Sequence, residues 1–338
     1  MIGIVSDIMF MNHDTGDYHP ECPLRIQYLH SLFAGNDDRQ ILLVDPVAAS
    51  AEDVMLNHGR SYVEMISQTS RSGSLVDLDP DTVCSSESYD VALCAAGSLM
   101  ELTKMAIDGR IDSGFACVRP PGHHARRDDA MGFCLFNNVA VAAHKAIRDF
   151  GVGKVAIIDF DVHHGNGTQE SFYSDNRVLY FSTHQYPFYP GTGAVSETGS
   201  GEGTGYTVNC PMRGGRSDGH YMAVYLYILK PLIEAFEPGL ILVSAGFDAH
   251  AKDPIGGMHV SSECFGAIAA VIGDAAEEVG APVIYSLEGG YDLHALKDSV
   301  HHVVRVLKGD PAAVIEPTAF PEMESFIKAH AHMWPLGV

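Results

Sequence analysis

Positive charge is what this sequence most clearly lacks. Its 338 residues include 21 lysines and arginines against 43 aspartates and glutamates, which gives a formal net charge of −22. Proteins that bind nucleic acid neutralise phosphates with basic side chains, so this balance argues against such a partner. The charge could draw a cationic substrate towards the protein, or it could simply keep an acidic surface soluble.

Long apolar runs and closely paired cysteines are absent as well. No stretch approaches the length of a membrane span, and residues 1–7 lack the basic region that opens a signal peptide. The seven cysteines are scattered and include no Cys-x-x-Cys pattern. This usage favours reduced thiols over a disulfide framework, so we predict a cytoplasmic protein with no membrane association.

The composition that is present suits one large folded domain. Hydrophobic residues make up 46% of the chain, enough for a sizeable core. We find no internal repeat, low-complexity tract or change of composition typical of a linker. The prediction is a single domain over residues 1–338, in which a proline-rich tail from about 311 to 338 wraps the surface.

Strand-like and helix-like segments alternate along most of the chain. Strands are predicted at 2–10, 41–44, 114–118, 155–159, 178–182, 240–243 and 282–287. Helices are predicted at 24–33, 89–107, 138–148, 168–173, 220–236, 263–279 and 293–308, and a capping-box pattern at Ser50 and Asp53 opens a further one. This alternation predicts an α/β fold with a mainly parallel sheet and helices on both faces.

The stretch 155–168 carries the densest chemistry. Four apolar residues are followed at alternate positions by Asp159, Asp161 and His163, which in an extended chain face the same side. Two carboxylates crowded together call for a positive partner, and Asp with His suits a divalent metal. The alternative is a pair of solvated acids beside a core histidine. His164 would point the opposite way from His163.

Reactive residues follow three other predicted strands at equivalent places. They lie in Arg119–His124, in Ser244–Asp248 and in Glu288–Tyr291. Ligands of parallel α/β sheets gather at the carboxyl ends of the strands. We therefore expect these segments and the 159–163 group to meet in one site.

Five motifs in order carry a family resemblance. They are Arg-Pro-Pro-Gly-His-His at 119–124, Gly-Phe-Cys-Leu-Phe-Asn at 132–137, Asp-Phe-Asp-Val-His-His-Gly-Asn-Gly-Thr at 159–168, Ala-Gly-Phe-Asp at 245–248 and Glu-Gly-Gly-Tyr at 288–291. Together they resemble the zinc-dependent histone deacetylase family, which includes acetylpolyamine amidohydrolases and bacterial deacetylase-like amidohydrolases. The likeness runs from His19 to Tyr291 and is closer to the class II and bacterial branches. It implies a single-domain, arginase/deacetylase-like fold.

The resemblance implies a metal centre made by Asp161, His163 and Asp248. Three protein ligands leave a position open for water or substrate, as a catalytic zinc requires. The set contains no thiolate, so Fe²⁺ or Mn²⁺ could also bind, although Zn²⁺ is favoured.

The resemblance also assigns the catalytic side chains of a metal-dependent amidohydrolase. His124 would be general base and then acid, His123 would support the charge, and Tyr291 would donate a hydrogen bond to the developing oxyanion. Asp159 and Asn166 would orient His123 and His124. The alternatives from the residues alone are loop histidines bonded to the backbone and a packing tyrosine.

Further family positions surround this predicted site. The acyl-lysine tunnel would be lined by Gly132, Phe133, Tyr189 and Ile255, with Tyr189 standing where phenylalanine is usual. Arg25 would line an inner cavity behind the metal. Two structural K⁺ or Na⁺ sites are also implied, the first at Asp159, Asp161, His163, Ser182 and Thr183 and the second at Phe172, Asp175, Val178 and Tyr206.

The substrate stays open at this point. Removal of an acyl group, most simply acetyl, from acyl-lysine in proteins or peptides is our prediction, and an acetylpolyamine is the first alternative. Asp14, Asp17 or Glu21 could supply an acid that recognises a polyamine at the mouth. An arginase-like ureohydrolase would need two manganese ions, whereas His164-Gly165 follows the ligands here in place of another acid. An inert metal-binding protein and the oligomeric state are left undecided.

Overall fold

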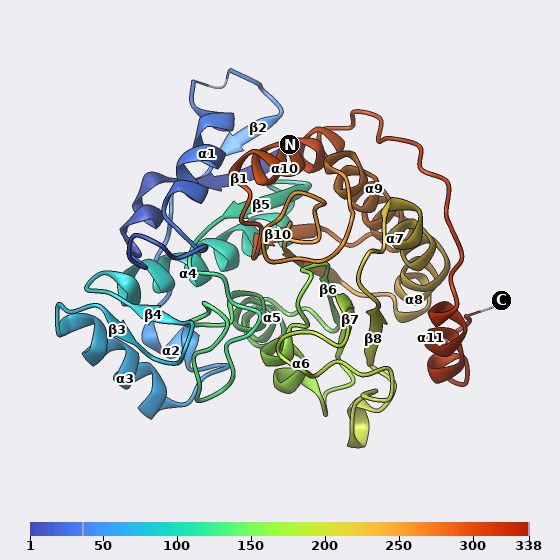
Figure 1. The fold of residues 1–338 in the computed structure, drawn as a ribbon, viewed down its shortest axis with the longest axis horizontal. Helices are drawn as coiled ribbons and strands as arrows, with labels where there is room; N and C mark the ends of the chain where they lie inside the picture. Colours follow the sequence, from blue (N-terminus) through green and yellow to red (C-terminus); the bar gives the residue numbers. More distant parts are fainter. Residues whose placement is uncertain (36, 337–338) are drawn as a thin grey trace.

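The computed structural model describes residues 1–35 and 37–336, and its centre is one parallel sheet (Figure 1). Eight strands pair in the order β2-β1-β5-β10-β9-β6-β7-β8, and every pairing is parallel. The strands are β1 (Ile2–Ser6), β2 (Ile41–Leu43), β5 (Ser113–Cys117), β6 (Val155–Asp159), β7 (Val178–Gln185), β8 (Thr207–Met212), β9 (Leu240–Ala245) and β10 (Val283–Leu287). The prediction of a mainly parallel α/β sheet is confirmed.

Two layers of helices cover the sheet (Figure 1). One layer contains α4 (Ser88–Ile107) packed against α5 (Asn138–Asp149). In the other, α1 (Leu24–Phe33), α10 (Leu293–Leu307), α9 (Ser262–Val279) and α8 (Lys230–Phe236) pack side by side. Because both faces are covered, β5, β6, β9 and β10 are buried along their whole length, which explains their nearly unbroken apolar sequences.

The remaining elements are short and lie mostly at the edges of this core. They are η1 (Ile8–Asn12), α2 (Ala51–Val54), α3 (Arg60–Arg71), the hairpin of β3 (Val76–Asp77) and β4 (Val83–Cys84), α6 (Asn166–Phe172), η2 (Gly201–Gly203), α7 (Asp218–Val224), η3 (Tyr225–Leu229) and α11 (Glu322–His330). The predicted capping box at Ser50 and Asp53 is confirmed, although the helix it opens has only four residues.

Three differences between the predicted and the observed elements have identifiable reasons. The first strand ends at Ser6, where the side chain of Asp7 accepts from Met9 N (2.7 Å) and starts the turn η1. The predicted helix 220–236 is divided by the π-helical segment η3, directly before Pro231. Proline cannot donate to the carbonyl four residues earlier, so it interrupts the helical ladder. Strand β8 escaped prediction because it contains Pro211, which is tolerated here because β8 lies at the sheet edge.

The tail after α10 runs along the outside of the helical layer and ends beside β8 (Figure 1). Helix α11 buries Phe326 and Ile327, and the indole of Trp334 donates to Gly205 O (2.8 Å). Apolar burial and this hydrogen bond therefore attach the tail to the sheet edge. No helix in the described part of the chain is long and apolar enough to cross a membrane.

Candidate active site

Two carboxylates and an imidazole meet at the carboxyl ends of β6 and β9. These strands are neighbours in the sheet, so Asp161 and His163, just after β6, lie next to Asp248, just after β9. His163 Nδ1 is 3.1 Å from Asp161 Oδ1 and 3.1 Å from Asp248 Oδ2. One donor atom of each residue lies within 4.8 Å of the others. The structure thus brings together the three residues expected to bind a metal.

Backbone amides hold both carboxylates in place. Gly289 N donates to Asp161 Oδ2 (2.8 Å), and Val162 N donates to Asp248 Oδ1 (2.8 Å). Each acid therefore keeps its other oxygen directed at His163. Glycine is required at position 289, because a Cβ there would lie 2.2 Å from Asp248 Oδ2.

The electrostatics of this cluster favour a cation at its centre. Burial alone would lower the pKa of His163, but the hydrogen bonds to Asp161 and Asp248 outweigh it and raise that pKa to about 10. Burial, then the neighbouring Asp161, raise the pKa of Asp248 to about 7. Positive charge is thus needed between the two acids, and two carboxylate oxygens with one imidazole nitrogen are a suitable donor set for a divalent metal.

Two adjacent histidines lie beside the cluster and have different partners. His123 Nδ1 is 3.0 Å from Asp159 Oδ2, and His124 Nδ1 is 2.8 Å from Asn166 Oδ1. Their ring centroids are 4.0 Å apart. The structure therefore places Asp159 and Asn166 against the histidines that the resemblance assigned to them.

The surroundings of the two histidines shift their pKa values in opposite directions. Burial would lower the pKa of His123, but Asp159 and Asp161 raise it to about 10. Burial, then the charge of His123, hold the pKa of His124 well below its usual value. The amide of Asn166 donates from Nδ2 to Met131 Sδ (3.3 Å), so its oxygen faces His124 and accepts from Nδ1. Neutral His124 consequently has an unprotonated Nε2.

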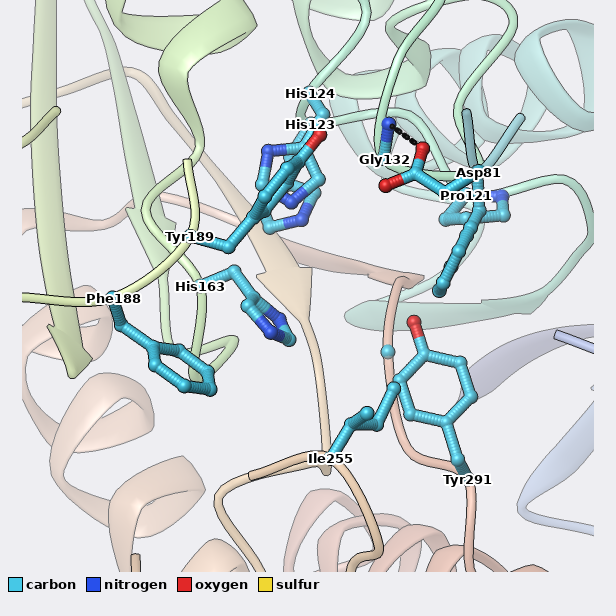
Figure 2. A pocket seen from close by; sticks show the side chains of 12 residues that line it. Asp81, Pro121, His123, His124, Gly132, His163, Phe188, Tyr189, Ile255 and Tyr291 are labelled. Atoms are coloured by element: carbon cyan, nitrogen blue, oxygen red, sulfur yellow. Dashed lines mark hydrogen bonds between the residues drawn. The ribbon is translucent and has the colours of Figure 1, made fainter. Parts of the chain in front are cut away.

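A cavity of about 220 Å³ opens onto these groups (Figure 2). Figure 2 shows the phenol of Tyr291 directed into it, with Ile255 nearby and Phe188 and Tyr189 on the far side. The rings of Phe133 and Tyr291 lie 5.8 Å apart, and the ring of Phe188 stacks on His163 at 5.3 Å. The lining residues are Asp81, Pro121, His123, His124, Gly132, Phe133, His163, Phe188, Tyr189, Ile255, Gly289 and Tyr291.

The hairpin β3–β4 holds one wall of this cavity in an unusual backbone conformation. Gly132 and Phe133 both have positive φ, of 56° and 68°. Asp81 Oδ1 accepts from Gly132 N (3.1 Å), and Thr82 Oγ1 accepts from Phe133 N (3.0 Å). A Cβ at Gly132 would lie 2.3 Å from His124, so only glycine lets this wall approach the histidine.

Sequence reasoning missed several lining residues, of which Asp81 and Phe188 are the most informative. Phe188 adjoins the predicted Tyr189, and a tunnel wall could have been extended by one residue. Asp81 lies in the hairpin turn, far from every motif, and no pattern connected it with the site. Burial, then the adjacent Asp79, raise the pKa of Asp81.

Arg25 lies behind Tyr291 and is not among the residues that line this cavity, and its place at an inner cavity behind the metal stays a prediction. Its Cζ is 5.0 Å from the Tyr291 ring, its Nε donates to Gly290 O (2.7 Å), and its Nη1 donates to Glu21 Oε1 (2.9 Å). Glu21 is fully buried between Arg25 and Arg119. The expectation that Glu21 could meet a polyamine at the mouth is therefore wrong, because both its oxygens are bonded inside the protein.

Residues expected at the monovalent-cation sites surround β7. Ser182 Oγ is 2.9 Å from His184 Nδ1, and Thr183 Oγ1 is 3.1 Å from Tyr225 OH. In the second group, Asp175 N donates to Phe172 O (3.0 Å) and Val178 N to Asp175 O (3.4 Å), while Tyr206 O accepts from Tyr180 N. These K⁺ or Na⁺ sites stay predictions.

His164 points away from the cavity. Its Nδ1 is 2.7 Å from Thr192 Oγ1, and its Nε2 is 3.0 Å from Gln169 Oε1. Both ring nitrogens are thus occupied inside the protein, as for a structural histidine.

The fold and the site together define a class. A parallel sheet that carries an Asp-His-Asp cluster, a histidine pair and a directed phenol at its carboxyl edge is the arrangement of a metal-dependent hydrolase. The "Histone deacetylase domain" family model matches residues 19–307. The chain belongs to the histone deacetylase family, and its domain is that of a deacetylase hydrolase.

Individual relatives agree with this assignment. "Histone deacetylase 5" of Arabidopsis thaliana is 38% identical over 95% of this chain, which spans 51% of that protein. A "Probable deacetylase" of Archaeoglobus fulgidus is 35% identical over 95% of this chain and 90% of its own length. The crystal structure of the HDA15 HD domain matches with a TM-score of 0.91 and 34% identity, covering 99% of this chain and 95% of that one.

Proposed function

We propose that this protein removes an acetyl group from the side-chain amine of acetyl-lysine in proteins or peptides, with zinc as its metal. The observation that carries this proposal is the convergence of neutral His124, charged His123, His163 and Tyr291 on one cavity, with Asp161 and Asp248 grouped around His163. Family membership supports the reaction type.

The side chains have separable roles in amide hydrolysis. Asp161, His163 and Asp248 would hold the metal, which supplies Lewis acidity and a more acidic bound water. Nε2 of His124 is free to take a proton from the attacking water and to return it to the leaving amine. His123, kept charged by Asp159, and the phenol of Tyr291 place positive charge and a donor where the oxyanion develops.

The cavity wall favours a linear alkyl chain. Phe133, Phe188 and Tyr189 are aromatic, and Ile255 is aliphatic. Such a lining accepts the methylene chain of an acyl-lysine and excludes water around the reacting amide.

The two predicted monovalent-cation sites belong to the same proposal. K⁺ or Na⁺ would bind there through oxygen atoms of Ser182, Thr183, Phe172, Val178 and Tyr206, with their partners.

The test compares rates for an acetyl-lysine peptide, acetylputrescine and acetylspermidine, alongside a count of metal per chain. The proposal expects the highest kcat/KM for the peptide and one zinc per chain, with activity lost on chelation and restored by zinc. Faster hydrolysis of the acetylpolyamines would replace the substrate assignment. Two manganese ions per chain with release of urea from arginine would instead indicate a ureohydrolase.

A further inference from the structure

Glu288 is a fully buried carboxylate for which the proposed reaction has no chemical use. It directly follows strand β10 and has no exposed surface. Its Oε2 accepts from the backbone N–H groups of Gly122 (2.6 Å) and His123 (3.2 Å). Its Oε1 accepts from Ser244 Oγ (3.1 Å). Burial of a carboxylate destabilises the folded state unless its oxygens accept hydrogen bonds in this way, so the presence of Glu288 here calls for an explanation.

The three partners belong to the two segments on either side. Strand β10 lies between β5 and β9 in the sheet. Gly122 and His123 belong to the loop after β5, which carries the histidine pair, and Ser244 lies in β9, four residues before Asp248. One side chain at the end of the middle strand therefore connects both neighbouring segments of the site.

The main chain that follows Glu288 is fixed just as firmly. The carbonyl of Glu288 accepts from Arg25 Nη2, and that of Gly290 accepts from Arg25 Nε (2.7 Å). Gly289 N donates to Asp161 Oδ2 (2.8 Å), and Tyr291 N donates to Asp253 Oδ2 (2.7 Å). The segment that carries Tyr291 is thus held rigidly, and the side chain of Glu288 couples it to the histidine loop.

We propose that Glu288 is a positioning residue, which keeps the His123–His124 loop in register with Tyr291 and the metal ligands. This proposal rests on the proposed deacetylation. Glu288 lines no part of the cavity and would act mainly through the backbone of the histidine loop, while its charge also helps to raise the pKa of His123. Its contribution would be to keep the reacting groups in the correct geometry. A displacement of a reacting group by about 1 Å can lower the rate by about 100-fold.

The experiment compares Glu288→Met with the matched control Glu288→Gln. Methionine has a similar length but accepts no such hydrogen bonds. Glutamine can accept from Gly122 N and His123 N through its oxygen and donate to Ser244 through its nitrogen. Burial raises the pKa of Glu288 to about 7, so a neutral amide is a reasonable substitute near neutral pH.

The expected result is a fall in kcat of about 100-fold for Glu288→Met, with KM and zinc content little changed. Glu288→Gln should keep kcat to within about tenfold of wild type. Wild-type kcat per zinc-loaded chain in Glu288→Met, whatever its Tm, would overturn the proposal. So would equal losses in both variants, because charge and not geometry would then be responsible.

Two further measurements keep the proposal testable. Should Glu288→Met fail to fold, Glu288→Asp retains the carboxylate but shortens its reach, and full kcat in that variant would overturn the positioning role. Hydrogen exchange needs no substrate: the amides in 119–126 should exchange faster in Glu288→Met than in Glu288→Gln, and equal rates would sink the idea. If the wild-type protein hydrolyses no acyl amine, the proposed function is wrong. The hydrogen-exchange rates would still show whether Glu288 holds the His123–His124 loop in place.

Discussion

Burial and the neighbouring charge of His123 keep His124 neutral, and Asn166 is a hydrogen-bond partner that adds no charge of its own. Its amide accepts from His124 without supplying a charge, while Asp159 supplies one to His123. Because their pKa values are separated in this way, neutral His124 is suited to act as a base and charged His123 is suited to stabilise negative charge. The identity of residue 166 should therefore set the pH range in which His124 can act as a base.

Replacement of Asn166 by Asp tests this difference. A carboxylate at hydrogen-bonding distance raises the pKa of an imidazole by about 1–3 pH units. Wild-type His124 has a lowered pKa, so its activity should fall only at pH values below 6.5. In Asn166→Asp the acid limb of the kcat/KM profile should move to higher pH, whereas Asn166→Ala, which adds no charge, should lower the rate without that movement. Identical acid limbs in wild type and Asn166→Asp would exclude His124 as the base.

Tyr291 contributes one hydrogen-bond donor to the proposed reaction. Removal of a single oxyanion donor in other enzymes costs about 2.7–4 kcal/mol of transition-state stabilisation, or about 10²–10³ in kcat. Tyr291→Phe should show a loss of that size, while its ring still packs beside Phe133 and Arg25. Steady-state kinetics with an acetyl-lysine peptide provide the measurement. Full activity in the variant would remove Tyr291 from the mechanism.

At the scale of elements, the β3–β4 hairpin supports a wall of the cavity from outside every motif. Thr82→Val removes the acceptor for the half-buried Phe133 N and should lower the free energy of unfolding by about 0.5–1.5 kcal/mol. We expect KM for the peptide to rise and zinc content to stay constant. Thr82→Ser keeps the hydroxyl and should behave as wild type. Unchanged KM in Thr82→Val would mean that Phe133 keeps its position without the hairpin.

Helix α11 carries a buried histidine, His330, whose two ring nitrogens have no hydrogen-bond partner among residues 1–35 and 37–336. Burial, then His332, lower the pKa of His330 to about 4, below the value of about 6.5 expected in the unfolded chain. The neutral form is therefore favoured in the folded state, and stability should fall as the pH drops from 6.5 towards 4. His330→Leu should lose part of this dependence, measured by denaturant unfolding at several pH values. Replacement of the exposed His259 by Leu is the control, because it leaves both His330 and His332 in place. Parallel curves for His330→Leu and wild type would refute the linkage.

The helices and strands that could be predicted are those whose local sequence pattern alone is enough to specify them. Apolar runs identified the central strands, and Ser50 with Asp53 identified a helix start. Strand β8 was missed because Pro211 and Asn209 weaken its strand pattern, and only its position at the sheet edge makes them acceptable. Helix α11 was missed because it depends on packing against that same edge.

For the whole molecule, the parallel topology explains why the site could be foreseen in outline. The carboxyl ends of parallel strands lie at the same edge of the sheet. The motifs at 119–124, 159–163, 244–248 and 288–291 were therefore expected to lie close together. The order of the strands, however, depends on tertiary packing, and no local pattern shows that β6 lies beside β9. The place of Asp81 in the site, and the contacts of Glu288 with both neighbouring segments, therefore became visible only in the structure.

The net charge of −22 gives a prediction about association at the same scale. Asp81 lines the cavity, and its N–H donates to Asp79 Oδ1 (3.0 Å), which places two half-buried acids together at this wall. A substrate peptide with basic residues around acetyl-lysine should be attracted over several ångströms, and salt should screen that attraction, since the Debye length is about 10 Å at 0.1 M. The kcat/KM of a basic peptide should therefore fall as sodium chloride rises from low to physiological concentration. A peptide with the same acetyl-lysine flanked by neutral residues should show little change, and equal salt dependence of the two peptides would mean that the acidic surface serves solubility alone.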